Sequence, residues 1–137
     1  MEPLPIRLTP GQDLRRALEA AVAAQGCRAA FVLAGIGSLA QAQVRLAGAR
    51  DACTQTGDLE IVTLAGTVTG SGSHLHASLA LADGTVLGGH LAYGCIVRTT
   101  AEILLALLRE WEFGRASDPA TGWHELVVRR TTREPGA

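Results

Sequence analysis

The sequence of 137 residues contains no lysine and no asparagine, and its 12 basic residues are all arginine. The absence of lysine excludes a Schiff-base lysine and a phosphate-binding lysine from its chemistry. The 13 acidic residues bring the formal net charge to −1, so the chain lacks the basic surplus of a protein that binds nucleic acid by charge alone. Lysine and asparagine have A-rich codons, and their absence indicates a GC-rich genome. We therefore expect a bacterial source.

Long hydrophobic runs and cysteine motifs are also scarce. Even the longest apolar runs, such as Ile103–Leu108, are far too short to cross a bilayer. The first residues carry neither the basic nor the apolar region of a secretory signal. The three cysteines form no Cys-x-x-Cys pair, which argues against a disulfide framework and against a cysteine zinc site. We expect a cytoplasmic protein with reduced thiols and no contact with a membrane.

Hydrophobic residues make up 47% of the chain, which is enough for the core of a single domain. An amphipathic helix is predicted over residues 10–25, because apolar residues recur there every three or four positions. Thr9 and Gln12 match a capping box at its start, and Gly26 matches a C-terminal cap. The Arg15-Arg16 pair lies on this helix and is predicted to form a solvated polar face.

Elsewhere the hydrophobic pattern favours strands. Alternation over residues 39–46 predicts a half-buried strand, with a helix as the alternative, and residues 95–108 fit either a strand or a helix. Gly35-Ile-Gly37-Ser38 matches a loose dinucleotide-binding pattern, but a small-residue turn explains it better, because no strand–helix–strand series follows. Three further strands are predicted over residues 28–34, 59–69 and 123–129, and a hairpin of two strands is predicted over residues 74–92.

Three histidines surround one predicted turn and are the strongest sign of chemistry in the sequence. His74 and His76 precede Asp83-Gly84, and His90 follows it. A two-residue turn at Asp83-Gly84 would place His90 on the opposite face of the hairpin from the other two. A three-residue loop over Ala82–Gly84, with Gly84 in a left-handed conformation, would instead place His76 opposite His90 and all three rings on one face.

The hydrophobic pattern favours the three-residue loop. A shift of one residue in register moves every side chain of a strand to the other face. With the longer loop the leucines of both strands form one apolar face, whereas the two-residue turn divides them and places His90 in the core. We therefore predict that His74, His76 and His90 share a face. There, three neutral imidazoles could bind zinc, nickel, copper or iron and leave a position open for water or an anion. The alternative is a group of exposed or hydrogen-bonded histidines without a metal.

The histidine segment resembles the core of the plants-and-prokaryotes conserved (PPC) domain. The resemblance rests on His74-x-His76, Gly88-Gly89-His90-Leu91 and Thr100-Ala101-Glu102. Further matches, in order along almost the whole chain, are Arg7-Leu8-x-Pro10-Gly11, Gly35-Ile-Gly37-Ser38, Glu60-Ile61 and Asp118-Pro119.

The resemblance implies an α+β fold: a compact single domain with a mostly antiparallel β-sheet and one main N-terminal helix. It also implies a homotrimer, and strand rather than helix at residues 95–108. Prokaryotic members often retain three histidines that are thought to bind zinc, and His74, His76 and His90 match that pattern. We expect the domain to span residues 1–129 and residues 130–137 to form a frayed tail.

Plant relatives in this family are DNA-binding nuclear proteins, and bacterial relatives carry the DNA-binding label by analogy. The plant proteins reach the minor groove through an AT-hook, an Arg-Gly-Arg-Pro core that this sequence lacks. DNA therefore enters only as a possible partner through the family resemblance.

Three functions stay open at this point. The chain could be a DNA-associated regulatory protein, a metal-dependent enzyme that acts on a small substrate near a subunit interface, or a non-catalytic trimer that binds a small ligand at the metal. Glu102 is the candidate catalytic residue, as a general base or as an acceptor that orients a ligand histidine, and a structural carboxylate is its alternative. His124 is expected to lie at the surface or at an interface.

Overall fold

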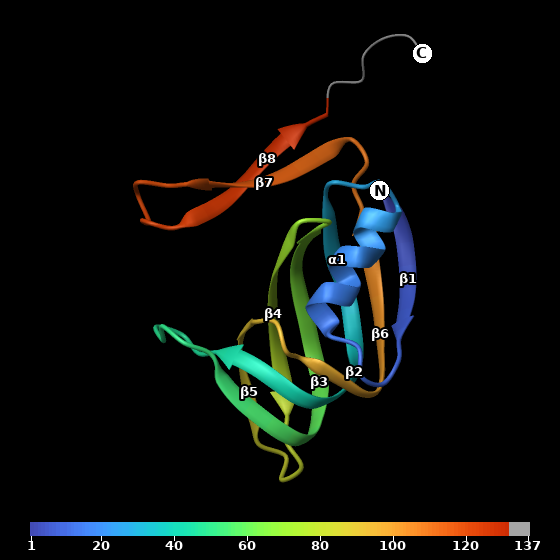
Figure 1. Ribbon diagram of the computed structural model, residues 1–137, viewed down its shortest axis with the longest axis vertical. Helices are drawn as coiled ribbons and strands as arrows, with labels where there is room; N and C mark the ends of the chain where they lie inside the picture. Colours follow the sequence, from blue (N-terminus) through green and yellow to red (C-terminus); the bar gives the residue numbers. More distant parts are fainter. Residues whose placement is uncertain (132–137) are drawn as a thin grey trace.

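The computed structural model describes residues 1–131, which form a curved six-stranded sheet, one helix and a separate two-stranded hairpin (Figure 1). The helix, α1, spans Leu14–Ala24. The strands are β1 (Glu2–Leu8), β2 (Ala30–Arg45), β3 (Cys53–Thr69), β4 (Gly72–Ala80), β5 (Val86–Leu91), β6 (Ile96–Leu107), β7 (Trp111–Ser117) and β8 (His124–Arg130). The predicted α+β class, with a mostly antiparallel sheet and one main helix, is confirmed.

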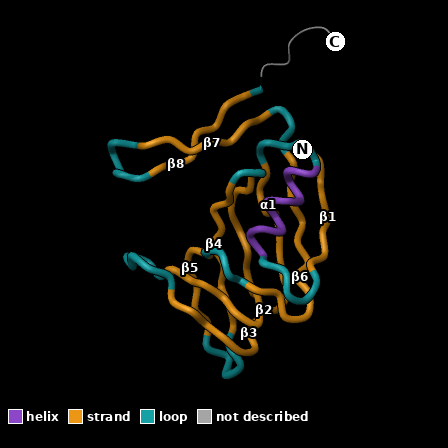
Figure 2. The backbone as a smooth tube through the Cα atoms, viewed as in Figure 1, coloured by secondary structure: helices purple, strands orange, loops and turns teal. Residues whose placement is uncertain are grey.

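The strand order of the large sheet is β1-β6-β2-β3-β4-β5, and all of its pairings are antiparallel. The end of β2 also pairs with β5, where Val44 faces Leu91 and Arg45 faces His90. This second pairing closes β2, β3, β4 and β5 on one another. In Figure 2 the helix lies against the sheet, and the β7–β8 hairpin extends across one end of it.

The core lies between α1 and the sheet. Leu14, Leu18 and Val22 form one stripe of the helix and are fully buried. The inward-facing leucines of the strands pack in the same cluster, and they include Leu39, Leu59, Leu75, Leu79, Leu91 and Leu105. Each buried leucine contributes about 1.5–3 kcal/mol of transfer free energy. The burial of these leucines therefore fixes which face of each strand points outward.

The helix begins four residues later than predicted. Gly11 has φ +86°, a left-handed conformation that interrupts a helix, so residues 9–12 form a turn. The N-cap is Asp13, whose side chain accepts a hydrogen bond from the backbone N–H of Arg16. Thr9 and Gln12 do interact, but inside the turn, where the Thr9 N–H donates to the Gln12 side chain at 2.8 Å.

The predicted strands at residues 28–34 and 39–46 are one continuous strand, β2. Gly35-Ile-Gly37-Ser38 therefore lies inside a strand and is not a turn. Gly37 has φ +145°, and a Cβ atom there would overlap the carbonyl oxygen of Thr100 on β6. The glycine thus permits a close approach of two strands. Residues 95–108 contain β6, as the resemblance implies, whereas β1 and β7 have no counterpart among the predicted strands.

The expected frayed tail, residues 130–137, falls largely outside the described residues, and Arg130 is the last residue of β8. Among residues 1–131, no helix is long and apolar enough to cross a membrane. Cys27 and Cys95 are buried and Cys53 is half-buried, and all three are free thiols.

Candidate metal centre

The histidines occupy one face of the β4–β5 hairpin, as predicted. His76 pairs with His90, and Leu79 pairs with Leu87 on the other face. The connection is the expected three-residue loop, because the Leu81 N–H donates to the Thr85 carbonyl at 2.8 Å and Gly84 has φ +82°. The register that buries the leucines thus brings the three imidazoles together.

The three rings converge on one point. The Nε2 atoms of His74 and His76 lie 3.1 Å apart. The ring centroid of His90 lies 5.1 Å from that of His74 and 5.6 Å from that of His76. Each ring offers a nitrogen that lies within 4.8 Å of the other two. In a tetrahedral zinc site with bonds of about 2.0–2.1 Å, ligand nitrogens are separated by roughly 3.3 Å. Small rotations of the rings therefore suffice to surround an ion.

The protonation of the rings also fits a metal. Burial, followed by the nearby charges of His74 and Arg45, lowers the pKa of His90 to about 4. Burial, followed by the charge of Arg115, lowers the pKa of His74. Both rings are therefore neutral at neutral pH, which is the form that binds metals. The buried Nδ1 of His90 has no hydrogen-bond partner among the described residues. A buried polar atom without a hydrogen-bond partner costs about 1–3 kcal/mol. A bound ion and its water could supply the partner that this nitrogen lacks.

Close backbone packing holds the strands that carry the histidines. Gly66 of β3 pairs with Leu75 and has φ +144°, and a Cβ atom there would overlap the carbonyl oxygen of His74. At Gly89 of β5, a Cβ atom would lie 2.5 Å from the carbonyl oxygen of Arg45 on β2. Both glycines are required for β3, β4, β5 and β2 to approach as closely as they do.

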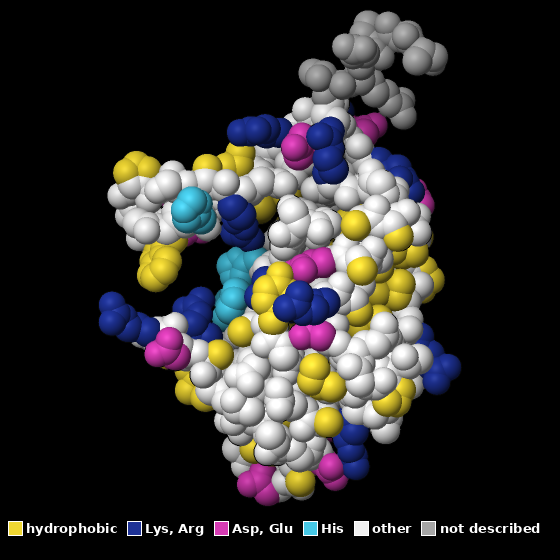
Figure 3. All heavy atoms as spheres, viewed as in Figure 1, with side chains coloured by type: hydrophobic (Ala, Val, Ile, Leu, Met, Phe, Trp, Pro, Cys, Tyr) yellow, Lys and Arg dark blue, Asp and Glu magenta, His cyan; other side chains and the backbone are white. Residues whose placement is uncertain are grey.

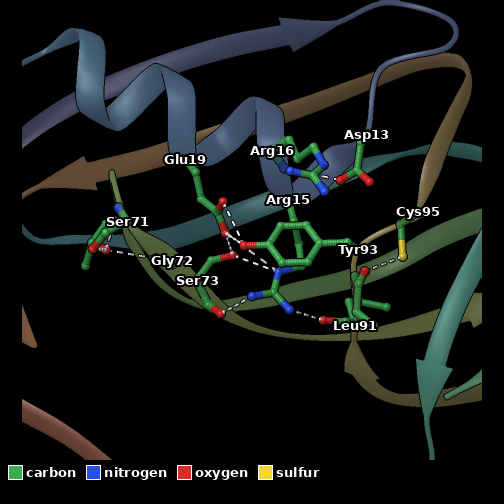
Figure 4. Close-up of polar contacts among 12 residues, drawn as sticks. Asp13, Arg15, Arg16, Glu19, Ser71, Gly72, Ser73, Leu91, Tyr93 and Cys95 are labelled. Atoms are coloured by element: carbon green, nitrogen blue, oxygen red, sulfur yellow. Dashed lines mark hydrogen bonds and ion pairs between the residues drawn. The ribbon is translucent and has the colours of Figure 1, made fainter. Parts of the chain in front are cut away.

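Arg15 of α1 clamps together β4 and β5, the two strands that carry the histidines (Figure 4). Its guanidinium donates to the carbonyl of Ser73 at 2.7 Å and to the carbonyl of Leu91 at 3.0 Å. These residues are the direct neighbours of His74 and His90. The predicted solvated face is therefore wrong for Arg15, which lies part-buried between the helix and the hairpin.

A carboxylate and an aromatic ring complete the clamp. Glu19 accepts hydrogen bonds from the hydroxyls of Ser73, at 2.6 Å, and Tyr93, at 3.0 Å. The guanidinium groups of Arg15 and Arg16 lie 4.2 and 4.6 Å from the centre of the Tyr93 ring. The only sequence signal was the Arg15–Glu19 spacing of four residues on a helix, which usually marks an exposed ion pair.

His74 and His90 line a cleft of about 950 Å³ between the β7–β8 hairpin and the sheet, and His76 is not among its lining residues. Figure 3 shows this hollow, with histidine side chains in cyan and arginine side chains in dark blue on its walls. The residues that line it are Arg45, Gly48, Ala49, Arg50, Ser73, His74, His90, Arg115, Trp123, His124 and Glu125. His124, expected at the surface, is exposed and forms part of this wall. Sequence reasoning missed the arginines of the cleft.

Glu102 lies elsewhere in the fold. It is an exposed residue of β6, where it pairs with Arg7 of β1 and Ile36 of β2. The strands β2 and β3 separate β6 from β4 in the sheet. The group of possible ligands in the described residues consists of the three histidines and does not include Glu102.

The family model of the Plants and Prokaryotes Conserved (PCC) domain matches residues 1–109. The chain belongs to this family. This is the plants-and-prokaryotes conserved family that the histidine segment resembles, so PCC and PPC denote the same domain. The match covers β1 to β6 and ends before the β7–β8 hairpin. The PCC domain of this chain therefore contains all three histidines, whereas one wall of the cleft lies beyond the matched residues.

Among curated proteins, the chain is similar to the bifunctional protein GlmU of Synechococcus sp. (strain JA-2-3B'a(2-13)). The two are 46% identical over an aligned length of 137, and the alignment covers 96% of this chain and 21% of GlmU. The chain thus spans about a fifth of the length of the curated relatives that it matches.

Solved structures share the fold over nearly the whole chain. A hypothetical protein from Salmonella has a TM-score of 0.92 and 34% identity, and the match covers 96% of this chain and 95% of that one. The metal-containing protein AF0104 from Archaeoglobus fulgidus has a TM-score of 0.74 and 29% identity, with coverage of 93% and 94%. A "putative dna binding protein" from Bacteroides thetaiotaomicron has a TM-score of 0.79, 22% identity and coverage of 91% of both chains, a likeness that shows the fold alone.

Proposed function

We propose that this PCC domain binds one Zn²⁺, or another divalent transition metal, through His74, His76 and His90. The observation that supports this most is the convergence of three imidazole nitrogens within 4.8 Å on two paired strands. The lowered pKa values of His74 and His90 and the metal-containing relative AF0104 agree with it. An ion held by three neutral imidazoles keeps an open position, where it would supply a Lewis acid or a binding point for an anion.

The cleft in front of the trio favours a small ligand or substrate over a purely structural ion. A structural zinc site is closed by four protein ligands, whereas an ion held by three histidines, two of which (His74 and His90) line a cleft, stays accessible. We infer that the metal centre serves ligand binding or catalysis on a small molecule. A bound ion would also join β4 to β5 across the hairpin.

A homotrimer is part of the proposal. The neighbouring strands β2 and β3 expose the large apolar side chains Leu33, Ile36 and Val62, each more than half exposed. Exposed large apolar side chains on neighbouring strands favour association of copies. Light scattering should give three times the chain mass of 14.3 kDa, and the chain mass itself would contradict the trimer.

DNA binding is the second candidate, favoured by the name of the Bacteroides relative that shares the fold. The absence of lysine and the net charge of −1 weigh against a large electrostatic contact. A gel-shift assay with A·T-rich duplex at low salt decides this point. Salt-dependent retardation at micromolar protein supports DNA binding, and no shift eliminates it.

The metal proposal is tested by titration against a chromophoric chelator, with untagged protein. The wild-type chain should bind one equivalent of Zn²⁺ or Co²⁺. His76 is the exposed member of the trio, so His76→Ala leaves the core intact, and it should weaken binding at least about 100-fold. His124→Ala is the matched control, because His124 lines the cleft outside the trio, and it should bind like wild type. Equal affinity of wild type and His76→Ala would overturn the proposal.

A further inference from the structure

Two arginines flank the histidine trio, and the first is Arg45. It pairs with His90 in the β2–β5 register, and His90 pairs with His76 in the β4–β5 register. Directly opposed residues of antiparallel strands point to the same face. Arg45, His90 and His76 therefore form one row across three strands, with the guanidinium at the β2 end of the row.

Arg115 approaches from the opposite side. His74 pairs with Thr67 of β3, so these two side chains share a face. Arg115 of β7 donates from Nη2 to Oγ1 of Thr67 at 3.4 Å. The β7–β8 hairpin thereby places a second guanidinium beside His74, and both arginines line the same cleft as His74 and His90.

The charge in this cleft is not neutralised by the described residues. Neither Arg45 nor Arg115 forms an ion pair within residues 1–131. The carboxylate on the cleft wall, Glu125, accepts a hydrogen bond from the Thr121 hydroxyl at 3.0 Å. Together with Arg50, the lining has three arginines against one glutamate, although the whole chain has a net charge of −1. A metal ion at the trio would add two further positive charges.

The size and the wall of the cleft limit the class of ligand. Its volume of about 950 Å³ lies within the usual range for small-molecule sites. Trp123 also lines the cleft, with 72% of its surface exposed, and provides an apolar surface beside the arginines and the histidines. A small organic anion combines the two features that this cleft presents, because it has charged oxygens and an apolar body.

We propose that the cleft binds a small oxyanion, a carboxylate or a phosphate, whose oxygens accept hydrogen bonds from Arg45 and Arg115 beside the metal centre. This inference rests on the proposed metal function, since the ion supplies part of the positive charge. Guanidinium groups suit this role because their planar donors match the geometry of carboxylate and phosphate oxygens. Arg45 and Arg115 are thus the residues that select an anionic ligand.

The test is calorimetric titration of Co²⁺-loaded protein with inorganic phosphate and with benzoate, while the Co²⁺ absorption spectrum is recorded. At least one anion should bind and change the spectrum. Tighter binding of benzoate assigns the site to carboxylates with an apolar body, and tighter binding of phosphate assigns it to phosphates. Arg45→Gln and Arg115→Gln should each weaken anion binding at least 10-fold and leave Co²⁺ affinity within about 2-fold of wild type.

Arg98→Gln is the matched control, because Arg98 is exposed on β6 and pairs with Asp58 at 2.9 Å, outside the cleft. It should bind the anion like wild type. Co²⁺ uptake without binding of either anion would overturn this inference alone, whereas failure to take up Co²⁺ would overturn the proposed metal function. An equal loss in Arg98→Gln, or a dependence on Arg45 and Arg115 seen only with duplex DNA, would also overturn the small-anion site.

Discussion

The substitution Gly66→Ala should damage the metal centre without touching a histidine. Gly66 has φ +144°, and an added Cβ atom would overlap the carbonyl oxygen of His74 and lie 2.9 Å from the Cα of Leu75. Both obstacles are backbone atoms of β4, so no side-chain rotation relieves the contact. The strand must move away from β3, and His74 must move with it. Gly57→Ala is the matched control on the same strand, because Gly57 has φ +112° and nothing lies within 4 Å of the added atom.

The two variants separate backbone strain from displacement of the ligand strand. A non-glycine residue in such a conformation costs about 1–3 kcal/mol, so Gly57→Ala should lower the free energy of unfolding by that amount. Gly66→Ala also displaces β4, so it should lower the free energy of unfolding by about 3–5 kcal/mol, in the range of disruptive core changes. Metal sites tolerate ligand displacements of only about 0.2 Å, so its Zn²⁺ affinity should fall at least 10-fold.

Urea denaturation of the metal-free proteins measures the stability of each variant, and chelator competition on the folded variants measures the affinity. Equal metal affinity of Gly66→Ala and Gly57→Ala would refute the claim that this close contact positions His74.

Three further predictions concern the groups around the site. Arg15→Met removes the donors to the carbonyls beside His74 and His90 and should lower Zn²⁺ affinity about 10-fold in the chelator assay, while unchanged affinity would contradict the clamp. Asp13→Ala removes the helix cap and the acceptor for the Gly94 N–H at 2.6 Å. It should lower the free energy of unfolding, measured by urea denaturation, by about 2 kcal/mol. A decrease of less than about 0.5 kcal/mol would speak against this double role. Between pH 6.5 and 4 the unfolded chain protonates His90 and the folded chain does not, so the unfolding free energy of the metal-free protein should fall by roughly 2 kcal/mol as the pH falls through this window. His90→Gln should remove most of that slope, and a slope unchanged in His90→Gln would assign it to other groups.

The histidine face could be predicted from sequence because its determinants are local. The alternation of leucines on both strands and the left-handed Gly84 allow one hairpin register, and that register fixes the direction of every side chain between residues 74 and 91. The helix could be predicted from its apolar period. Its start could not, because Thr9 and Asp13 are both good caps and the choice depends on the left-handed Gly11.

The rest of the site depends on contacts between distant segments. Arg45 joins the histidine row only because β2 is long enough to pair with β5 after pairing with β3 and β6. Arg115 and His124 reach the cleft because the β7–β8 hairpin crosses one end of the sheet, which no local pattern encodes. From sequence, Arg15 has the spacing to Glu19 of an exposed helical ion pair. Only the fold shows that the β4–β5 hairpin packs against it.

The central claim of this account is that His74, His76 and His90 hold one ion, and X-ray absorption at the zinc edge of the zinc-loaded protein tests it most directly. We predict a first shell of three imidazole nitrogens at about 2.0–2.1 Å and one further light atom, with no sulfur. A sulfur at about 2.3 Å, or fewer than three imidazoles around the ion, would contradict the claim.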